Sequence, residues 1–295
     1  MALKTNEKNC VEMVIQVQPG HPPSTGRWTV GHHGTPYNLP SIGGITLNIQ
    51  VGDSAFGWEG DHLEPGVSAT ACQDTQKHPN QGAQYYACAG NMAQVISGKA
   101  KGAKGVVLGH HGGSEHLVID FPRKVKEKMT YDDKMIIHTK GQGLKLLDYP
   151  EVHVMNIDPD LLKKLKIKEL KNGKLEVPVT TIVPAACMGS GLGTTSSHRG
   201  DYDVMTSDPA SVKKYKLDQM RFGDLVAIMD HYNLYGPTYK QGAVSIGILI
   251  HSDCVNSGHG PGITTILTCD AGQIAPKIDS KACLADILKM GTQKK

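Results

Sequence analysis

The 295-residue sequence is poor in aromatic residues, which make up only 5% of it and include 3 Phe and 2 Trp. It also lacks a strong excess of either charge, because 31 Lys and Arg stand against 28 Asp and Glu. Proteins that bind nucleic acids through their charge normally carry a marked basic excess, so the balance argues against that class. With 39% hydrophobic and 20% charged residues, the chain is nevertheless typical of a folded globular protein.

Long apolar segments are missing as well. The longest apolar run, Val244 to Ile250, includes Ser245 and Gly247 and is far shorter than the roughly 20 residues that cross a bilayer. The first residues, MALKTNEKNCVEM, lack the apolar core of a signal peptide. The 7 cysteines form no CxxC pair, and their odd number favours reduced thiols over a disulfide framework. We therefore expect a cytoplasmic protein that binds neither membranes nor nucleic acids.

Glycine, by contrast, is abundant, with 34 residues, and many short segments alternate β-branched with polar residues. Such patterns predict strands separated by turns. The expected strands are residues 11–18, 45–51, 105–108, 116–121, 134–139, 152–156, 175–183, 224–229, 243–251 and 264–269. The expected helices are residues 90–97, 158–170, 207–215 and 280–290, and the polar stretch 72–83 predicts a loop. We predict an α+β fold dominated by strands, with barrel-like β sheets in two lobes and a few short helices.

The composition changes near residue 158, where a segment rich in Lys and Leu begins. Asp158 and the proline after it fit the cap and first turn of a helix. We place the boundary between the lobes here. This gives an N-terminal β-rich lobe over residues 1–157 and a C-terminal α+β lobe over residues 158–295.

The first candidate site is the segment GHHGGSEHLVID at residues 109–120. If its last five residues form a strand, His116 and Asp120 share one face. The glycine-rich turn before that strand can bring His111 back toward His116. Imidazoles and carboxylates are common ligands of catalytic Zn²⁺, Mn²⁺ or Fe²⁺, and Glu115 would be a candidate general base. The alternative is a glycine hairpin with polar loop histidines.

The second candidate site is the segment IHSDCVNSGHGPG at residues 250–262. His251 ends a strand in which it shares a face with small residues, and these leave room for a ligand. His259 lies between glycines, and the backbone N–H groups around Gly260 and Gly262 suit an anion or a developing oxyanion. The alternative is a bulge and a turn with two hydrogen-bonded histidines.

Three further residues are candidates because of their places in the sequence. Asp230 lies where the apolar pattern of a strand breaks, which suits a metal ligand or an acid/base group. Tyr239 and Arg199 could contact substrate. A surface loop explains Tyr239 equally well, and Arg199 could instead pair with Asp201 or Asp203.

Two other segments give weaker signals. Cys187 lies in a turn of small residues and would be a nucleophile only with a base beside it. Asp61, His62 and Glu64 in the segment GDHLEPG could complete a site built from both lobes, but they read slightly better as solvated turn residues.

With these segments assembled, the chain resembles the bacterial and archaeal family known as domain of unknown function 4438. The resemblance rests on long motifs in order: GDHLEPGVS at 60–68, KGAKGVVLGHHGGSEHLVIDFP at 101–122, GQGLKLLDYPEVHVMN at 141–156, VPAACMGSGLG at 183–193, RGDYD at 199–203, RFGDLVAIMD at 221–230, and KQGAVSIGILIHSDC with GHGPG within 240–262. His110 stands where we expect Lys in this family, which weakens any role for His110 and leaves His111. The resemblance implies membership without an activity. The turns are also similar in style to those of metal-dependent formamidases and acetamidases, a likeness of β-rich fold only.

Three functions are open, and we favour the first. It is a metal-dependent hydrolase or lyase acting on a small polar substrate such as an amide, with its site between the two lobes. The expected metal ligands are His111, His116, Asp120 and His251, the catalytic groups Glu115, His259 and Asp230, and the substrate contacts Arg199, Tyr239, Gly260 and Gly262. The second is a metal-free small-molecule-binding or oligomeric assembly protein, and the third uses covalent chemistry at Cys187. We also expect a homo-oligomer, because exposed strand edges are often covered at subunit interfaces.

Overall fold

The computed structural model describes residues 3–22 and 28–291 and is dominated by strands. The strands are β1 (Met13–Pro19), β2 (Thr29–Val30), β3 (Pro36–Tyr37), β4 (Ile45–Thr46), β5 (Gly66–Thr70), β6 (Met92–Val95), β7 (Lys104–His111), β8 (His116–Asp120), β9 (Met135–Thr139), β10 (His153–Val154), β11 (Lys168–Glu169), β12 (Leu175–Val179), β13 (Thr181–Val183), β14 (Tyr202–Asp203), β15 (Leu225–Tyr232), β16 (Thr238–His251), β17 (Gly262–Cys269) and β18 (Ile274–Ile278). The helices are α1 (His78–Tyr86), α2 (Arg123–Lys126), α3 (Pro159–Lys164), α4 (Pro209–Tyr215) and α5 (Leu284–Leu288), with 3-10 turns at Glu7–Asn9, Ala185–Cys187 and Leu217–Gln219. The predicted strand-dominated α+β fold is confirmed.

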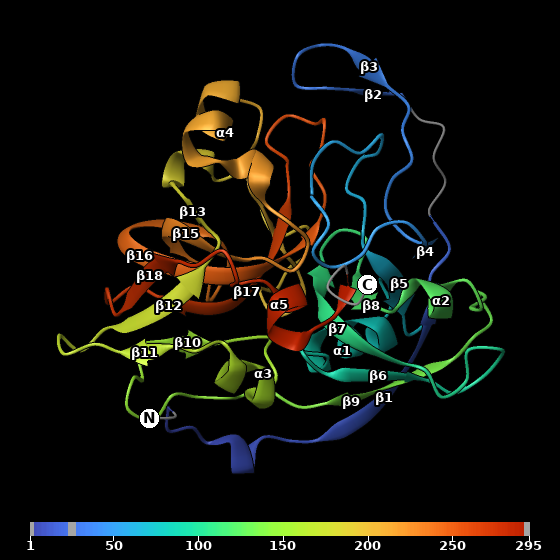
Figure 1. The fold of residues 1–295 in the computed structure, drawn as a ribbon, viewed down its shortest axis with the longest axis horizontal. Helices are drawn as coiled ribbons and strands as arrows, with labels where there is room; N and C mark the ends of the chain where they lie inside the picture. Colours follow the sequence, from blue (N-terminus) through green and yellow to red (C-terminus); the bar gives the residue numbers. More distant parts are fainter. Residues whose placement is uncertain (1–2, 23–27, 292–295) are drawn as a thin grey trace.

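The first sheet closes into a barrel. Its strand order is β1-β9-β6-β7-β8-β5-β4, and β1 also pairs with β5, so six strands form a ring with β4 attached. Closure removes exposed edges from those six strands. Leu117, Ile119 and Phe121 are fully buried in the core cluster inside the barrel. Figure 1 shows the barrel strands together on the side of the molecule where β6, β8 and β9 are labelled.

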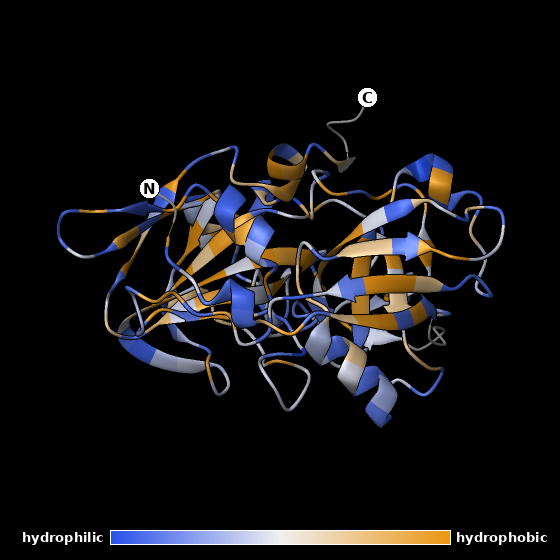
Figure 2. Cartoon of the chain, turned by 90° about the horizontal axis from the view of Figure 1, so that it is seen from below, coloured by the Kyte–Doolittle hydropathy of each residue, from blue (hydrophilic) through white to orange (hydrophobic). Residues whose placement is uncertain are grey.

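The second sheet has the order β10-β17-β16-β15-β13, with β14 also paired to β17, and β11-β12-β18 form a smaller sheet beside it (Figure 1). The predicted apolar stripe of β16, which runs from Val244 to Ile250, packs into a large core cluster. Leu108 of β7 and Val118 of β8 belong to the same cluster, so barrel and second sheet share one core. Figure 2 shows hydrophobic residues concentrated in the strands of both sheets.

A close backbone approach joins the barrel to the second sheet. The His110 N–H of β7 donates to Thr264 Oγ1 of β17 at 2.9 Å, and that hydroxyl donates to the His110 carbonyl at 3.1 Å. A Cβ at Gly109 would lie only 2.3 Å from Thr264 Oγ1, so the approach requires glycine here. The contact fixes the end of β7 beside β17 and its neighbour β16.

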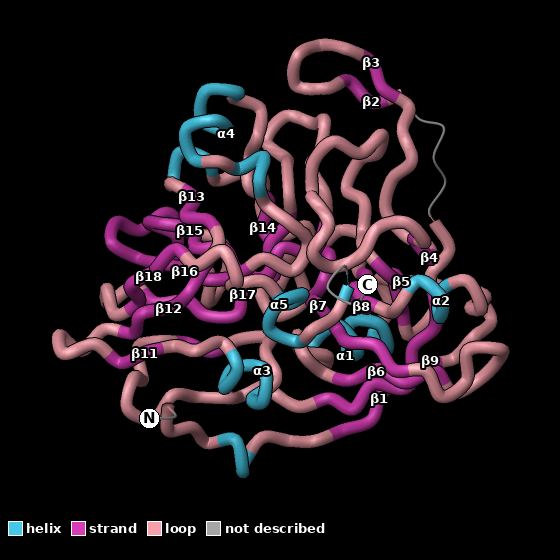
Figure 3. Tube along the Cα trace, viewed as in Figure 1, coloured by secondary structure: helices cyan, strands magenta, loops and turns pink. Residues whose placement is uncertain are grey.

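Long loops gather on one side of the two sheets, above the strand ends in the view of Figure 3. The hairpin of β2 and β3 is tied to one of them, because the His32 N–H donates to the Val255 carbonyl at 2.8 Å. No helix among the described residues is long and apolar enough to cross a membrane.

Two predicted elements are wrong. Residues 90–97 contain strand β6 rather than a helix, because Met92 to Val95 pair on one side with β7 and on the other with β9. The polar stretch 72–83 is not all loop, since α1 begins at His78. Polar residues form that helix because the buried side-chain amides of Asn80 and Gln84 each donate a hydrogen bond to the Glu115 carbonyl, in the turn before β8.

The predicted helices 158–170, 207–215 and 280–290 contain α3, α4 and α5, which are shorter, whereas α2 was not predicted. Asp158 accepts a hydrogen bond from the Asp160 N–H and caps α3, as the sequence predicts. Asp208 caps α4 in the same way. The division of the chain after residue 157 stays a prediction.

Candidate metal centre

Histidines from three distant segments meet where the barrel joins the second sheet. The ring of His111, at the end of β7, stacks on that of His251, at the end of β16, with centroids 4.3 Å apart. His62, from the loop before β5, lies 4.9 Å from the His251 ring and 5.9 Å from the His111 ring. The fold thus brings the two predicted histidine segments together and adds a third.

Two aspartates on and beside β14 complete this cluster. His251 Nε2 lies 2.8 Å from Asp201 Oδ2 and 3.2 Å from Asp203 Oδ1. The other oxygen of Asp203 lies 2.7 Å from His259 Nδ1. Gly262 stands opposite Asp203 on β17, and a Cβ there would lie about 2 Å from both Asp201 Oδ2 and His251 Nε2. Glycine at this position therefore makes room for the approach of carboxylate and imidazole.

Oxygen atoms outside the cluster orient two of the imidazoles. His251 Nδ1 donates to the Ser252 carbonyl at 2.9 Å, and His62 Nδ1 is bonded to Asp61 Oδ2 at 3.0 Å. In each ring this leaves Nε2 for the cluster. Metal-binding histidines characteristically use one nitrogen for the metal and the other for a carboxylate or carbonyl oxygen.

Glu64 orients the third imidazole from a fully buried position. Its Oε1 lies 2.6 Å from His111 Nδ1, and its carboxylate is also bonded to His116 Nδ1 at 3.1 Å. Glu64 Oε2 accepts the Gly43 N–H at 2.9 Å and the Ser68 hydroxyl. Burial raises the pKa of Glu64, but the two imidazoles outweigh it and hold the pKa well below 4.5. Glu64 is thus an ionised support for His111 and His116.

The contact between Asp201 and His251 is unusual because it is not an aligned hydrogen bond. Asp201 Oδ2 and His251 Nε2 are buried and have no hydrogen-bond partner of good geometry among the described residues. The Ser252 carbonyl can only accept, so Nδ1 carries a hydrogen, and Nε2, which faces two carboxylates, is left for a second proton or for a cation. Ligand atoms bound at about 2.1 Å to one ion lie about 3.0 Å apart at right angles and about 3.4 Å apart in a tetrahedral site, somewhat more than the 2.8 Å observed here.

Strong charge coupling accompanies this geometry. Burial alone would lower the pKa of His251, but Asp201 and Asp203 raise it well above 6.5. Burial also works against the charged form of His62, yet its bonds to Asp203 and Asp61 raise the pKa to about 11. Three imidazoles lower the pKa of Asp203 despite its burial. The cluster attracts protons strongly, and a cation would compete with protons for the same nitrogens.

Comparison with known proteins gives a family but no activity. The family model for domain of unknown function (DUF4438), N-terminal, matches residues 28–163, and the C-terminal model matches residues 151–288. The chain belongs to the DUF4438 family. A solved structure, described as the crystal structure of TM1086, is 44% identical, has a TM-score of 0.90, and is matched over 97% of this chain and 99% of that chain. No curated protein matches the chain.

Several predicted ligands of this DUF4438 protein lie outside the cluster. His116 stands opposite His111 in the β7–β8 hairpin, but it contacts Glu64 rather than the aspartates. Asp120 is four residues further along β8, about 13 Å away at the usual rise, and lines another cavity with Lys104. The strand that His116 and Asp120 share is therefore too extended for both to reach one ion.

Two other predicted residues lie near the far end of β16. Asp230 has a φ of 53° at a bulge in β15 and accepts the Gly242 N–H at 2.7 Å. Gly242 precedes His251 by nine residues of β16, about 30 Å of extended strand. Tyr239 is 62% exposed in the same region. Asp230 caps a local bulge, and neither residue is part of the cluster.

Glu115 and Arg199 lie beside the cluster. Glu115 has a φ of 55° in the β7–β8 turn, and the side chains of Asn80 and Gln84 hold its carbonyl. Burial raises the pKa of the Glu115 carboxyl, while the nearby Arg199 charge opposes that rise. The guanidinium of Arg199 also donates to Thr195 Oγ1 at 2.8 Å, so its predicted pairing with Asp201 or Asp203 is not the bond observed.

Gly260 and His259 lie at the edge of the cluster. A Cβ at Gly260 would lie 2.0 Å from the Val204 carbonyl, so this glycine permits backbone packing. His259 is bonded to Asp203 and, at 3.2 Å, to Ser190 Oγ, and about a third of its side chain is exposed. Its position gives it access to both the cluster and solvent.

The residues given least weight from the sequence are central in the structure. The sequence slightly favours Asp61, His62 and Glu64 as solvated turn residues. In the structure His62 belongs to the cluster, and Asp61 and Glu64 are bonded to the imidazoles of His62 and His111. The signal was present in RGDYD, where Asp201 and Asp203 alternate and so share a strand face. No sequence pattern marks Cys254 as a ligand, although its segment also holds His251.

Cys187 lies elsewhere, and its environment does not activate it. It is buried, and burial raises the pKa of its thiol. Its side-chain interactions are with Ser211 and Asp208, not with a histidine that could act as a base.

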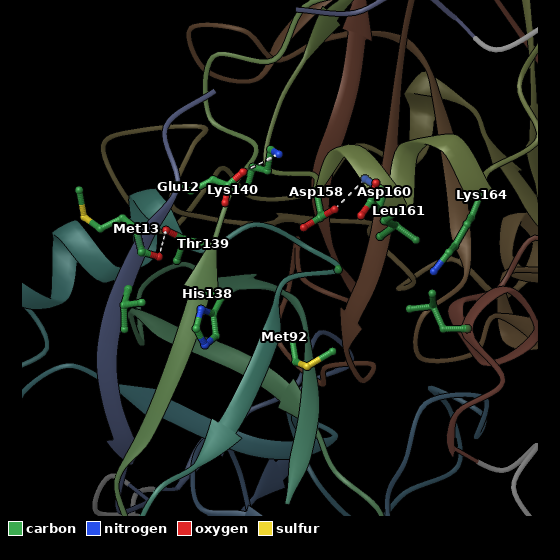
Figure 4. A pocket seen from close by; sticks show the side chains of 13 residues that line it. Glu12, Met13, Met92, His138, Thr139, Lys140, Asp158, Asp160, Leu161 and Lys164 are labelled. Atoms are coloured by element: carbon green, nitrogen blue, oxygen red, sulfur yellow. Dashed lines mark hydrogen bonds and ion pairs between the residues drawn. The ribbon is translucent and has the colours of Figure 1, made fainter. Parts of the chain in front are cut away.

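Two cavities differ in how they lie relative to the histidine cluster. A cavity of about 640 Å³ lies against β1, β6, β9 and α3, where Glu12 and Lys140 form a 2.7 Å ion pair (Figure 4). None of its lining residues belongs to the cluster. A cavity of about 200 Å³ is lined by Tyr37, Trp58 and Cys254 among others, and by Ser252, the residue after His251 of the cluster. We take the smaller cavity as the approach to the cluster.

Proposed function

We propose that this DUF4438 protein is a metal-dependent hydrolase of a small polar substrate. A divalent ion would be held by His111, Asp201 and His251, whose candidate ligand atoms all lie within 4.8 Å of one another. The observation that carries the proposal is the buried, unaligned pair of Asp201 Oδ2 and His251 Nε2 at 2.8 Å. Two such atoms facing each other are satisfied by a shared cation. Mixed nitrogen and carboxylate ligands favour Zn²⁺, Mn²⁺ or Fe²⁺.

The groups around this ion suit hydrolysis. A bound divalent ion lowers the pKa of water from 15.7 to about 7 and so supplies a nucleophile at neutral pH. Burial, together with the nearby Asp201 charge, raises the pKa of the Glu115 carboxyl, which suits a proton acceptor. We assign Glu115 the acid/base role. His259, which is partly exposed and bonded to Asp203, borders the same site.

The adjoining cavity limits the size of the substrate. Its volume of about 200 Å³ fits a small molecule, and Tyr37 and Trp58 contribute aromatic surface to its wall. Gly60, Ser252 and Asp253 belong to the same wall. A small amide or ester combines these properties.

Metal content is the decisive measurement. Protein made without a histidine tag is expected to contain at least one ion per chain by mass spectrometry. Asp201→Asn keeps an oxygen for the Gly112 N–H, which Asp201 accepts at 2.7 Å, but loses the charge, so it is expected to lose the ion. Asp230→Asn is the matched control and should keep it. Amide and ester hydrolysis should follow metal content.

Two results would contradict the proposal. Absence of metal after anaerobic reloading with Zn²⁺, Mn²⁺ and Fe²⁺ would favour the metal-free binding or assembly protein. Thermal-shift measurements with small ligands would then be the next step. A tightly bound ion without hydrolysis of any amide or ester would reject the hydrolase but retain the metal centre.

A further inference from the structure

We propose that the cluster holds a second divalent ion, bound by His62, Cys254 and His259 and linked to the first through Asp203. This inference rests on the proposed function, because it adds an ion to the same centre. The candidate ligand atoms of His62, Cys254 and His259 all lie within 4.8 Å of one another. The two imidazole rings are nearly perpendicular, at 71°, with centroids 5.3 Å apart.

Asp203 is placed to bridge the two ions. Its Oδ1 lies 3.2 Å from His251 Nε2, in the first group of ligands. Its Oδ2 lies 2.7 Å from His259 Nδ1 and 3.7 Å from His62 Nε2, in the second group. The two oxygens of one buried carboxylate therefore face two different sets of ligands. Paired metal ions about 3.5–4 Å apart are a common arrangement in hydrolytic enzymes.

Asp61 holds the second set of ligands in place. One of its oxygens is bonded to His62 Nδ1 at 3.0 Å, and the other accepts the Val255 N–H at 3.1 Å. The same carboxylate thus orients His62 and anchors the loop that carries Cys254. An orienting carboxylate behind a ligand histidine is the arrangement found around His111 and Glu64 as well.

Cys254 would bind as a thiolate only when an ion displaces its proton, because burial raises the pKa of its thiol to about 11. It is 5% exposed, and its Sγ accepts the Asn256 N–H at 3.2 Å. A backbone N–H directed at sulfur supports negative charge there, and a coordinated thiol is deprotonated by the ion. This thiolate makes the second set of ligands softer than the first, which has none. Zn²⁺ suits such a site better than Mn²⁺.

The two positions differ in access as well as in chemistry. Asp201 and His251 of the first are buried, whereas Cys254 lines the small cavity and His259 is partly exposed. The second ion would therefore face an entering substrate, while the first is enclosed. His62, Cys254 and His259 would thus hold the ion that offers Lewis-acid chemistry to an entering substrate, and His111, Asp201 and His251 the enclosed ion.

Cobalt titration tests the second ion directly. The full-length protein is stripped with a chelator and titrated with Co²⁺, whose bond to a thiolate gives a near-ultraviolet charge-transfer band. We expect about two equivalents to bind and the band to accompany one of them. Cys254→Ser should lose the band and bind about one equivalent. The control Cys187→Ser should keep both.

The outcomes separate this inference from the proposed function. One equivalent without a thiolate band, or two equivalents in Cys254→Ser, would overturn the second site and leave the first. No cobalt binding at all would contradict both. If circular dichroism shows that Cys254→Ser does not fold, His259→Gln is used instead. The side chain of His259 is partly exposed, so its replacement should disturb the fold less. That variant is expected to bind about one equivalent, and two would overturn the proposal.

Discussion

The protein contains two buried groups of histidines and carboxylates that differ in how completely their atoms are paired. In the Glu64 group, both carboxylate oxygens are bonded, to His111, His116, Gly43 and Ser68. In the neighbouring aspartate group, Asp201 Oδ2 and His251 Nε2 face each other without an aligned hydrogen bond. Nearly the same residue types and similar burial therefore serve two purposes. The paired group is bonded within the fold, and the unpaired group includes side chains that could hold a cation.

The largest effect is expected from breaking the paired group. Glu64→Ala leaves two imidazoles, a hydroxyl and the Gly43 N–H without their carboxylate. Loss of one partner from a buried ion pair costs about 3–5 kcal/mol of unfolding free energy. Urea unfolding measures it. Glu127→Ala is the control, because its 2.8 Å pair with Arg123 is exposed and should change stability by about 0–1 kcal/mol. Equal effects of the two variants would show that Glu64 is not a structural support.

Removal of metal tests the unpaired group. An ion that binds the native state at 100 times its dissociation constant stabilises it by about 2.7 kcal/mol. Chelation is therefore expected to lower the melting temperature of the parent protein, measured by calorimetry. Asp201→Asn, which cannot hold the ion, should show no shift on chelation. If the parent protein melts at the same temperature with and without chelator, the unpaired group holds no stabilising ion, and its contrast with the paired Glu64 group fails.

His231 separates the effect of carboxylates from that of burial. It is completely buried without a carboxylate among its bonding partners, and burial lowers its pKa to about 4. Because the folded pKa is below 6.5, its contribution to stability is present above pH 6.5 and is lost as pH falls toward 4. From pH 7 to pH 5 this is a loss of about 2 kcal/mol.

Replacement of His231 measures that loss. His231→Gln is expected to be less stable than the parent near pH 7 but to depend less on pH between 6.5 and 4. Denaturant unfolding at several pH values gives both slopes. Identical pH dependence of the two proteins would mean that His231 is protonated equally in the folded and the unfolded state. Burial alone would then not control its protonation.

The smallest effect is expected at Cys187. Burial raises the pKa of its thiol, which bonds to Ser211 and lies near the charge of Asp208. Cys187→Ser should therefore change metal content and hydrolytic rate by less than about twofold. Loss of activity with full metal content would revive covalent chemistry at this residue.

The sequence predicted most of the local structure that supports the site. The β7–β8 hairpin has His111 opposite His116, as the glycine turn indicated, and the apolar stripe of β16 packs in the core as its alternation indicated. The helix predicted at residues 90–97 is a strand because pairing with two neighbours outweighs local preference. Such pairing is a tertiary effect that a local pattern does not contain.

By itself the sequence determined the strand-rich fold, the two histidine segments and the strand faces on which their side chains lie. Only the tertiary structure decided which of these side chains share a site. The cluster joins His62, His111, Asp201 and His251, which are separated by up to 189 residues along the chain, and the Gly109–Thr264 contact sets their spacing. Strand periodicity fixes direction within one element, whereas distance between elements depends on how barrel and sheet pack. For that reason Asp120 and Asp230, which fit the strand pattern, lie away from the cluster, whereas Asp201 and Asp203 lie beside His251.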